Sequence, residues 1–192
     1  MFLLTGLGNP GTEYENTRHN AGFMAADEFV RRYNFSGWKK RFNGETAEGT
    51  IDGEKIVVLK PLTFMNNSGQ AVRAAMDFFK LPVEKIVVMH DDMDLPVGKV
   101  KAKTGGGAGG HNGLRSIDAH CSPDYARVRF GVGHPQSREQ VVNWVLTGFA
   151  KADKDIMKET FEDVAEILPV LFKEGPAAFT SRLAVYKSKG KG

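Results

Sequence analysis

The sequence predicts a single-domain α/β protein with a mixed, mostly parallel central sheet flanked by helices. Short buried runs such as residues 2–7 and 85–90 alternate with longer amphipathic stretches, which is the pattern of an α/β fold. Some predicted strands follow one another directly, so part of the sheet must be antiparallel. The 192 residues suit one domain, and 41% apolar residues are enough for a core.

In the first half of the chain, residues 2–7 are expected to form a buried strand and residues 8–19 a polar loop. Asn20 is placed as the N-cap of a helix through "AGFMAADEFVRRY". The segment "TAEGTIDGEKIVVLK" predicts a hairpin with Asp52 and Gly53 in its tight turn. Cap residues and an amphipathic pattern in "NNSGQAVRAAMDFFK" predict a second helix.

In the second half, "KIVVMH" predicts a buried strand that ends in an acidic loop, "DDMD". The stretch "GKVKAKT" alternates as a half-exposed strand does, so its three lysines share a face. A short helix is expected at "NGLRSIDAHC" and a strand at "RVRFGVG", with both arginines on one face. The chain from about residue 137 is expected to be helical, with breaks or kinks at Gly148, Pro169 and Gly175-Pro176.

The domain is expected to span residues 1–187, followed by a disordered basic tail at 188–192. A net charge of +3 allows an anionic partner without requiring one. The single cysteine, Cys121, excludes an internal disulfide and is expected to be an inert thiol in a reducing cytosol. Neither a signal peptide nor an apolar run of membrane-spanning length is recognisable, so a cytoplasmic location is expected.

Two glycine-rich stretches satisfy the bare pattern G-x-G-x-x-G: "GLGNPG" at residues 6–11 and "GGGAGG" at 105–110. After the first, "TEYENTRHN" lacks the apolar pattern of a helix that packs on a sheet, which argues against a dinucleotide site. The second lacks the Gly-Lys-Ser/Thr ending of a P-loop. It leads instead into a helix start at Asn112, with lysines beside it, and we expect it to contact a phosphate.

The histidines and carboxylates leave two kinds of chemistry open. His90, Asp91, Asp92 and Asp94 in "HDDMD" suit either a metal site or a solvated acidic turn, and we expect no metal and no other cofactor. A general base acting on water is favoured over a covalent nucleophile, because there is no Gly-x-Ser-x-Gly elbow and no reactive cysteine. His19 and His111 are the candidate bases. Amides at Asn9, Asn66 and Asn112 are positioned to bind a carbonyl oxygen or oxyanion.

Four stretches together resemble the bacterial peptidyl-tRNA hydrolase family: "GLGNPGTEYENTRHNAG", "KPLTFMNNSG", "HDDMDLPVGKVKAKTGGGAGGHNGL" and "RVRFGVGHP". They occur in the family's order and cover nearly the whole chain. The resemblance implies a monomeric, metal-free esterase with a mixed sheet. Its substrate would be peptidyl-tRNA, whose peptide is released from the terminal ribose so that the tRNA is recycled. No membrane and no obligate protein partner are implied.

The resemblance also implies roles for particular residues. His19 matches the catalytic base, Asp91 the carboxylate that orients it, and Asn9 the residue that distinguishes N-blocked from free aminoacyl groups. The other matched positions bind substrate or tRNA: Tyr14, Phe64, Asn66, Asn112, the neighbouring His111, and the basic Lys101, Lys103 and Arg129. Arg115 is a further candidate, and Lys99 is expected to be a solvated charge. The segment "DAHCSPDY" departs from the family's usual turn.

Two rival hypotheses remain at this point. One is a metal-dependent hydrolase built on "HDDMD". The other is a non-enzymatic RNA-binding module that uses "KVKAK", "RVR" and the basic tail. The second rival lacks a repeated aromatic stacking motif and leaves His19 and Asp91 without a role.

Overall fold

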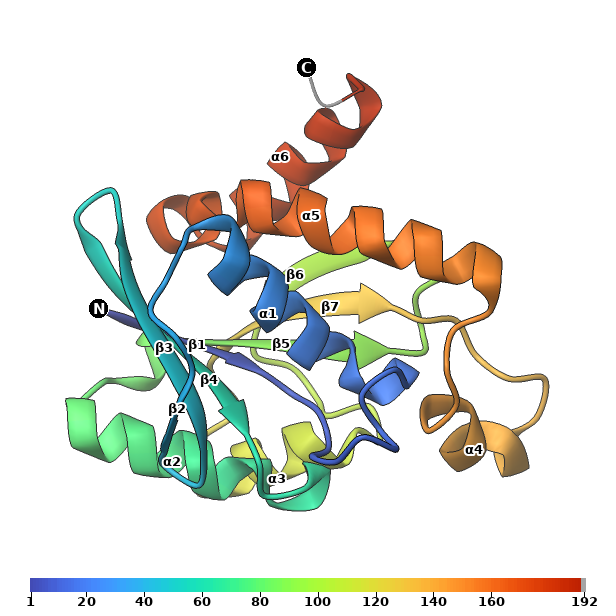
Figure 1. Cartoon of the computed structure of the whole chain (residues 1–192), viewed down its shortest axis with the longest axis horizontal. Coiled ribbons are helices and arrows are strands. Elements are labelled where there is room, and N and C mark those ends of the chain that lie inside the picture. Colours follow the sequence, from blue (N-terminus) through green and yellow to red (C-terminus); the bar gives the residue numbers. More distant parts are fainter. Residues whose placement is uncertain (191–192) are drawn as a thin grey trace.

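The computed structural model describes residues 1–190 and contains a seven-stranded sheet between two layers of helices (Figure 1). The strand order is β2-β3-β4-β1-β5-β7-β6. β4, β1, β5 and β7 run parallel, and the remaining pairings are antiparallel, which confirms a mixed sheet with a parallel centre. The strands are β1 (Phe2–Gly6), β2 (Lys39–Arg41), β3 (Gly44–Ile51), β4 (Glu54–Pro61), β5 (Ile86–Asp92), β6 (Val100–Thr104) and β7 (Ala126–Gly131).

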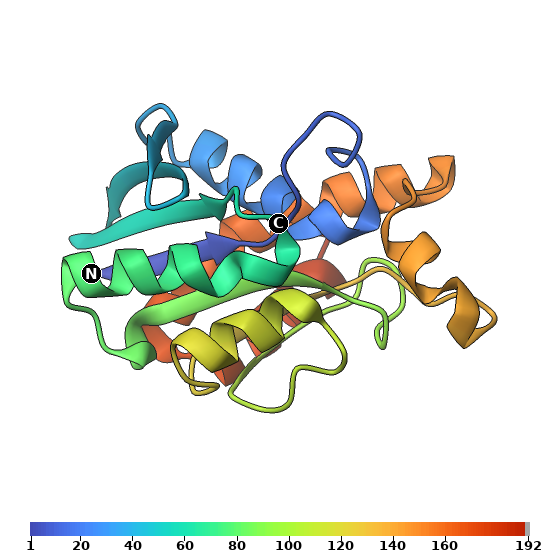
Figure 2. The ribbon, with the colours of Figure 1, turned by 90° about the horizontal axis from the view of Figure 1, so that it is seen from below.

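Helices cover both faces of the sheet. α1 and α5 lie on one face, and α2 and α3 lie together on the other, as the view from below shows (Figure 2). The short α4 stands beyond the carboxyl ends of the parallel strands (Figure 1). The helices are α1 (Ala21–Arg32), α2 (Ser68–Phe79), α3 (Asn112–His120), α4 (Val141–Val145), α5 (Lys151–Glu174) and α6 (Pro176–Ser188). Short 3-10 turns are η1 (Arg18–Asn20), η2 (Met65–Asn67), η3 (Val83–Lys85) and η4 (Arg138–Gln140).

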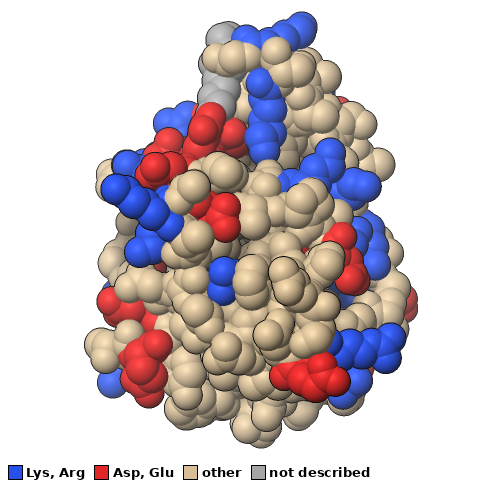
Figure 3. Space-filling model, turned by 90° about the vertical axis from the view of Figure 1, so that its right-hand side faces the viewer, with Lys and Arg blue, Asp and Glu red and all other residues tan. Residues whose placement is uncertain are grey.

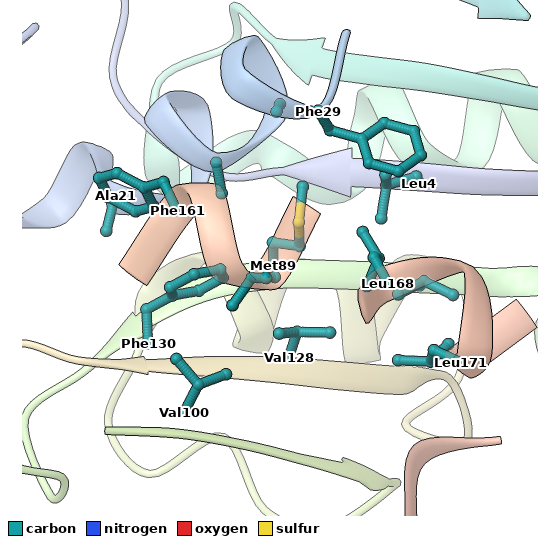
Figure 4. Packing of buried hydrophobic residues seen from close by; sticks show 14 of the residues in the cluster. Leu4, Ala21, Phe29, Met89, Val100, Val128, Phe130, Phe161, Leu168 and Leu171 are labelled. Atoms are coloured by element: carbon teal, nitrogen blue, oxygen red, sulfur yellow. The ribbon is translucent and has the colours of Figure 1, made fainter. Parts of the chain in front are cut away.

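The central strands are apolar on both faces because both faces are covered. Leu4 and Met89 pack against α1 and α5 (Figure 4), whereas Leu3 and Val88 pack against α2 and α3. All four side chains are fully buried. Such a sheet has little room for polar groups along its length, so they gather outside the strand ends.

Several predicted boundaries are confirmed, one is wrong, and of the break or kink expected at Pro169 the break is absent. Asp52 and Gly53, with φ of 51° and 82°, form the tight turn of the β3–β4 hairpin as expected. The acidic residues do not begin a loop: β5 continues through Asp91 and Asp92, which pair with β7. Pro169 does not end its helix either, since α5 runs on to Glu174 while its apolar face stays packed on the core.

The C-terminal part follows the expected breaks at Gly148 and at Gly175-Pro176, which separate α4, α5 and α6. Of the expected tail, Ser188 still belongs to α6, and residues 191–192 lie outside the described part of the chain. Within residues 1–190, none of the helices has the length and apolar character needed to cross a bilayer.

Candidate active site

A cavity of about 470 Å³ lies at the carboxyl ends of the parallel strands. It is bounded by the loop after β1, the segment after β4, the second glycine loop with the start of α3, and α4. Figure 3 looks onto this end of the molecule, where basic and acidic side chains surround a largely uncharged centre. Ten of the sequence-predicted residues line the cavity: Asn9, Tyr14, His19, Phe64, Asn66, Asp91, Lys103, His111, Asn112 and Arg129.

His19 and Asp91 form a hydrogen-bonded pair across 72 positions of sequence. His19 Nδ1 lies 2.9 Å from Asp91 Oδ2 and 3.0 Å from Oδ1. η1 places the histidine just before α1, and the last residues of β5 place the carboxylate. Because an ionised carboxylate only accepts, Nδ1 carries the proton and Nε2 keeps its lone pair. This is the tautomer that a general base needs.

His111 provides a second imidazole for the same carboxylate. Its Nε2 lies 2.8 Å from Asp91 Oδ1. Its Nδ1 accepts the backbone N–H groups of Gly113 and Leu114, at 3.1 and 3.3 Å, and so caps the N-terminus of α3. Backbone N–H groups can only donate, so Nδ1 is unprotonated and Nε2–H donates to Asp91. Asp91 therefore accepts hydrogen bonds from two histidines.

The charges of the cluster follow from burial and from this pairing. Burial raises the pKa of Asp91, but the two histidines outweigh it, so that the pKa lies below its usual range. Burial lowers the pKa of His19, whereas the charge and hydrogen bond of Asp91 raise it, and the net shift is upward. Behind them, burial and the neighbouring His111 lower the pKa of His90 to about 4, so that His90 is neutral at pH 7.

Asn9 is held by groups from two other segments. Its Oδ1 accepts the backbone N–H of Met65 at 2.7 Å. The amide of Asn20 binds the Asn9 backbone twice, accepting from its N–H at 2.8 Å and donating to its carbonyl at 3.0 Å. With Oδ1 engaged, the Asn9 Nδ2 group has no partner among residues 1–190 and remains a donor for a ligand in the cavity.

Asn20 stands at the N-cap position of α1, as the sequence predicts, but its side chain makes no cap hydrogen bond. It is buried, with 1% of its surface exposed, and supports the loop that carries Asn9. Sequence reasoning missed this role. The one available signal was its place directly after His19 in "RHNAG".

Phe64 has an unusual backbone for a residue with a side chain. Its φ and ψ are 60° and 155°, a region populated almost only by glycine. Its ring is 55% exposed at the cavity and meets that of Tyr14 edge-to-face, with centroids 6.5 Å apart. Hydrogen bonds on either side hold the conformation, from Met65 N to Asn9 Oδ1 and from Asn67 N to the Phe64 carbonyl. Strain held at a ligand cavity is typical of functional residues.

The basic residues divide into three environments. Lys103 and Arg129 line the cavity, and Arg129 Nε donates to Asp92 Oδ2 at 2.8 Å. Lys101, opposite Arg129 in the β6–β7 ladder, is exposed but lies outside the cavity lining, as does Arg115 on α3. Arg127, the other arginine of "RVR", is fully buried.

The second glycine loop is organised by Arg127. Its guanidinium donates to the carbonyls of Gly106 and Gly107 at 3.0 and 2.9 Å. It also donates to the Pro123 carbonyl and to the Asp118 carboxylate. These bonds hold the loop at two carbonyls, and both Arg127 and the loop from Gly107 to Gly110 line the cavity.

The proposed metal ligands of "HDDMD" do not converge. His90 Nδ1 binds the Asp91 carbonyl, and Asp92 is paired with Arg129. In the described part of the chain, His19, Asp91 and His111 instead bring one donor atom each within 4.8 Å of one another. Those atoms are already joined by N–H···O hydrogen bonds. A metal there would have to displace protons, so the trio as it stands is arranged for proton chemistry.

Fold and cavity together define an α/β protein with a histidine–aspartate pair at the carboxyl edge of its sheet. The sequence model of the family described as "Peptidyl-tRNA hydrolase" matches residues 3–191. The peptidyl-tRNA hydrolase of Rhodospirillum centenum is 52% identical over 185 residues, covering 96% of this chain and 82% of the relative. That of Rhodopseudomonas palustris is 55% identical over 171 residues, covering 88% and 85%.

A solved structure of a peptidyl-tRNA hydrolase has the same fold. Peptidyl-tRNA hydrolase from Acinetobacter baumannii superposes with a TM-score of 0.91 at 36% identity, covering 95% of this chain and 94% of that one. The chain belongs to the peptidyl-tRNA hydrolase family. This confirms the resemblance and the fold that the sequence predicts.

Proposed function

We propose that this chain hydrolyses the ester between the peptide, or N-blocked aminoacyl group, and the terminal ribose of peptidyl-tRNA, with His19 as the general base. One observation carries the mechanism: Asp91 holds the Nδ1–H of His19 at 2.9 Å inside a cavity that amides also line. The family supplies the substrate and the geometry supplies the chemistry.

The reaction begins when His19 Nε2 takes a proton from a water molecule, which attacks the ester carbonyl. Asp91 stabilises the imidazolium that forms and keeps its orientation. The amides of Asn9 and Asn66 donate to the carbonyl oxygen as it becomes negative, or position the peptide backbone. The ribose oxygen then leaves and takes the proton from His19.

The cavity explains a preference for N-blocked substrates. A peptidyl or N-acetyl group offers an amide where free aminoacyl-tRNA has a cationic amine. Amide groups placed to bind that peptide group would be badly paired around an ammonium. We assign this discrimination to Asn9, Asn66 and Asn112, all of which border the cavity.

The tRNA is recognised through its phosphates and its unpaired acceptor end. Lys103 and Arg129 bind phosphate, with Lys101 contributing from outside the cavity. The exposed ring of Phe64 and the half-buried ring of Tyr14 contact the terminal nucleotides. We further infer that residues 1–187 act as one domain and as a monomer, in the cytoplasm where the substrate is formed.

The decisive experiment is release of N-acetyl-amino acid from N-acetyl-aminoacyl-tRNA by the wild-type protein and by His19→Ala. The variant is expected to lose about 10²–10⁴-fold in kcat while deacylated tRNA still binds. His134→Ala is the matched control, because His134 lies outside the cavity lining. A His19→Ala protein with near-wild-type turnover would remove His19 from the mechanism, and loss of activity on exhaustive chelation would favour the metal-dependent rival.

Asn9→Ala tests the discrimination between substrates. It is expected to narrow the preference for N-acetyl-aminoacyl-tRNA over aminoacyl-tRNA, measured as the ratio of kcat/KM values. Asn67→Ala is the control, since Asn67 is exposed and does not line the cavity. If the preference persists undiminished in Asn9→Ala, the discriminating group lies elsewhere.

A further inference from the structure

The residue directly before the general base is a buried arginine. Only 5% of the surface of Arg18 is exposed. Its guanidinium stacks on Trp144, with Cζ 3.5 Å from the ring centroid, and Nη1 donates to the carbonyls of Trp144 and Thr147 at 3.0 and 3.3 Å. Among the described residues its buried Nε has no hydrogen-bond partner, so the ring stacking and the two Nη1 bonds are the contacts that hold the buried charge.

The carbonyls that Arg18 binds belong to the C-terminal end of α4 and the residues that follow. Each of these carbonyls also accepts a backbone N–H, so the guanidinium is a second donor to partly negative oxygens at the end of a helix. The backbone makes the same connection: Arg18 N–H donates to the Thr147 carbonyl at 3.0 Å, and Thr17 forms a β-bridge with Gly148. The catalytic loop and the end of α4 are thus joined by side chain and backbone.

α4 itself is a short helix with an apolar surface toward the cavity. It has five residues, too few for a helix to be stable without tertiary contacts. Its other tether is Trp144 Nε1, which donates to the Gly133 carbonyl. Val142 and Leu146 line the same cavity as His19 and are 69% and 38% exposed. Exposed apolar side chains inside a ligand cavity are placed to contact an apolar part of that ligand.

We propose that Arg18 is a positioning residue that clamps α4 to the catalytic loop, so that contact of an apolar acyl side chain with Val142 and Leu146 favours the productive placement of His19. This inference rests on the proposed hydrolysis of peptidyl-tRNA. It assigns α4 as the surface that contacts the amino-acid side chain next to the ester. It makes Arg18 the physical link between that surface and the base.

The test compares N-acetyl-leucyl-tRNA with N-acetyl-glycyl-tRNA as substrates for Arg18→Met, Arg18→Lys and the surface control Arg31→Met. Arg31 is an exposed arginine that forms an ion pair with Glu28 on its own helix. Arg18→Met keeps much of the side-chain volume but donates to neither carbonyl. We expect kcat on the leucyl substrate to fall by about ten- to a hundredfold, the scale of a small misplacement of a catalytic group. The affinity for deacylated tRNA should not change.

Two further readouts separate positioning from a merely structural role. The leucyl-to-glycyl ratio of kcat should fall by several-fold in Arg18→Met, and equally in Val142→Ser and Leu146→Ser. Arg18→Lys, which keeps the charge but loses the planar fork, should recover part of the rate. It also serves as the test protein if Arg18→Met does not fold.

The outcomes are distinguishable. Wild-type protein that releases no N-acetyl-amino acid overturns the proposed function itself. Active wild type with Arg18 variants that keep both kcat and the leucyl-to-glycyl ratio within twofold overturns the clamp alone. A kcat loss equal for both substrates would also overturn it, because Arg18 would then support His19 without any link to the side-chain surface.

Discussion

The two glycine loops satisfy the same bare pattern, yet the structure uses their glycines for opposite reasons. In the first loop the glycines make room. A Cβ on Gly6 would lie 2.2 Å from the Gly22 carbonyl oxygen, and one on Gly8 would lie 2.6 Å from the ring of Phe23. β1 therefore packs against α1 at backbone contact distance, which fixes Asn9 and His19 relative to β5.

In the second loop, Gly106 alone would bring a Cβ into close contact, and that contact is with the flexible end of Lys103, whose Nζ would lie 2.8 Å away. A Cβ on Gly107, Gly109 or Gly110 would have no neighbour within 4 Å. Gly109 and Gly110 are needed for conformation, since their φ values are 60° and 82°. The first loop is thus closely packed and leads into the segment that holds the proposed base, and the second leaves open backbone beside Lys103 and Asn112. A glycine pattern alone does not distinguish the two.

The largest expected effect comes from replacing Asp91, the carboxylate that binds the proposed general base His19. Asn in place of Asp91 offers one oxygen to two imidazole donors, so one histidine must face an N–H group. If His19 changes tautomer, its Nε2 is protonated and no longer a base. Asp91→Asn should lower kcat by at least about 10²-fold without unfolding the protein. Steady-state kinetics measure this, with Asp155→Asn as the control because Asp155 is exposed and lies outside the cavity lining.

The pH profile gives a second readout for the same variant. Asp91 raises the pKa of His19, and the base is active only when neutral, so wild-type kcat/KM should fall as pH drops through that raised pKa. Without the carboxylate, the acidic limb should move to lower pH. An acidic limb that stays in place in Asp91→Asn would remove the pair from the mechanism.

The most direct test of the difference between the two loops is to add one methyl group to a glycine in each. Gly6→Ala forces a Cβ against backbone that cannot easily move, and we expect a loss of about 3 kcal/mol in the free energy of unfolding. The new methyl group of Gly107→Ala lies in open space, so this substitution should change the free energy of unfolding by less than about 1 kcal/mol. Urea unfolding of both variants measures this, and equal losses would contradict the distinction.

The buried side of the second loop adds a pH-dependent term. The ring of His90 lies against that of His111, with centroids 5.2 Å apart. Burial lowers the pKa of His90 to about 4, so the unfolded chain takes up a proton below its ordinary pKa of about 6.5 while the folded protein does not. The stability from neutral His90 is complete above about pH 6.5 and is lost as pH falls toward 4.

The loss of unfolding free energy should reach about 3 kcal/mol at the acidic end, measured by urea unfolding at several pH values. His90→Gln should flatten the slope between pH 6.5 and 4, whereas His134→Gln, at an exposed position, should not. An unaltered slope in His90→Gln would assign the acid sensitivity to another group.

The smallest expected effect lies at the open edge of the second loop. Lys103→Ala should reduce the slope of log Kd for tRNA against log salt by about one unit, and Lys99→Ala should leave it unchanged. Lys103 lines the cavity, whereas Lys99 does not. Filter binding at several salt concentrations measures the two slopes. Equal slopes for the two variants would contradict a direct phosphate contact by Lys103.

The sequence predicted the elements that depend on local patterns and the residues that carry the family's motifs. The buried strands, the Asp52-Gly53 turn and the proximity of His19 to Asp91 all belong to this group. The hydrogen bonds of Asn20 and Arg18 could not be predicted from the sequence. Arg18, for example, binds Trp144, which lies 126 positions away, and no periodic pattern connects the two residues. The sequence did not indicate that His111 caps α3, because Ser, Thr, Asp and Asn are the usual N-cap residues.

The backbone of Phe64 has a consequence for engineering. A glycine at this position would adopt φ 60° and ψ 155° without penalty, whereas the phenylalanine stores about 1–3 kcal/mol there. A screen that selects only for thermal resistance should therefore recover Phe64→Gly, and with it an enzyme that has lost its exposed ring at the substrate cavity. If Phe64 binds substrate as proposed, stability and substrate affinity are opposed at this one residue.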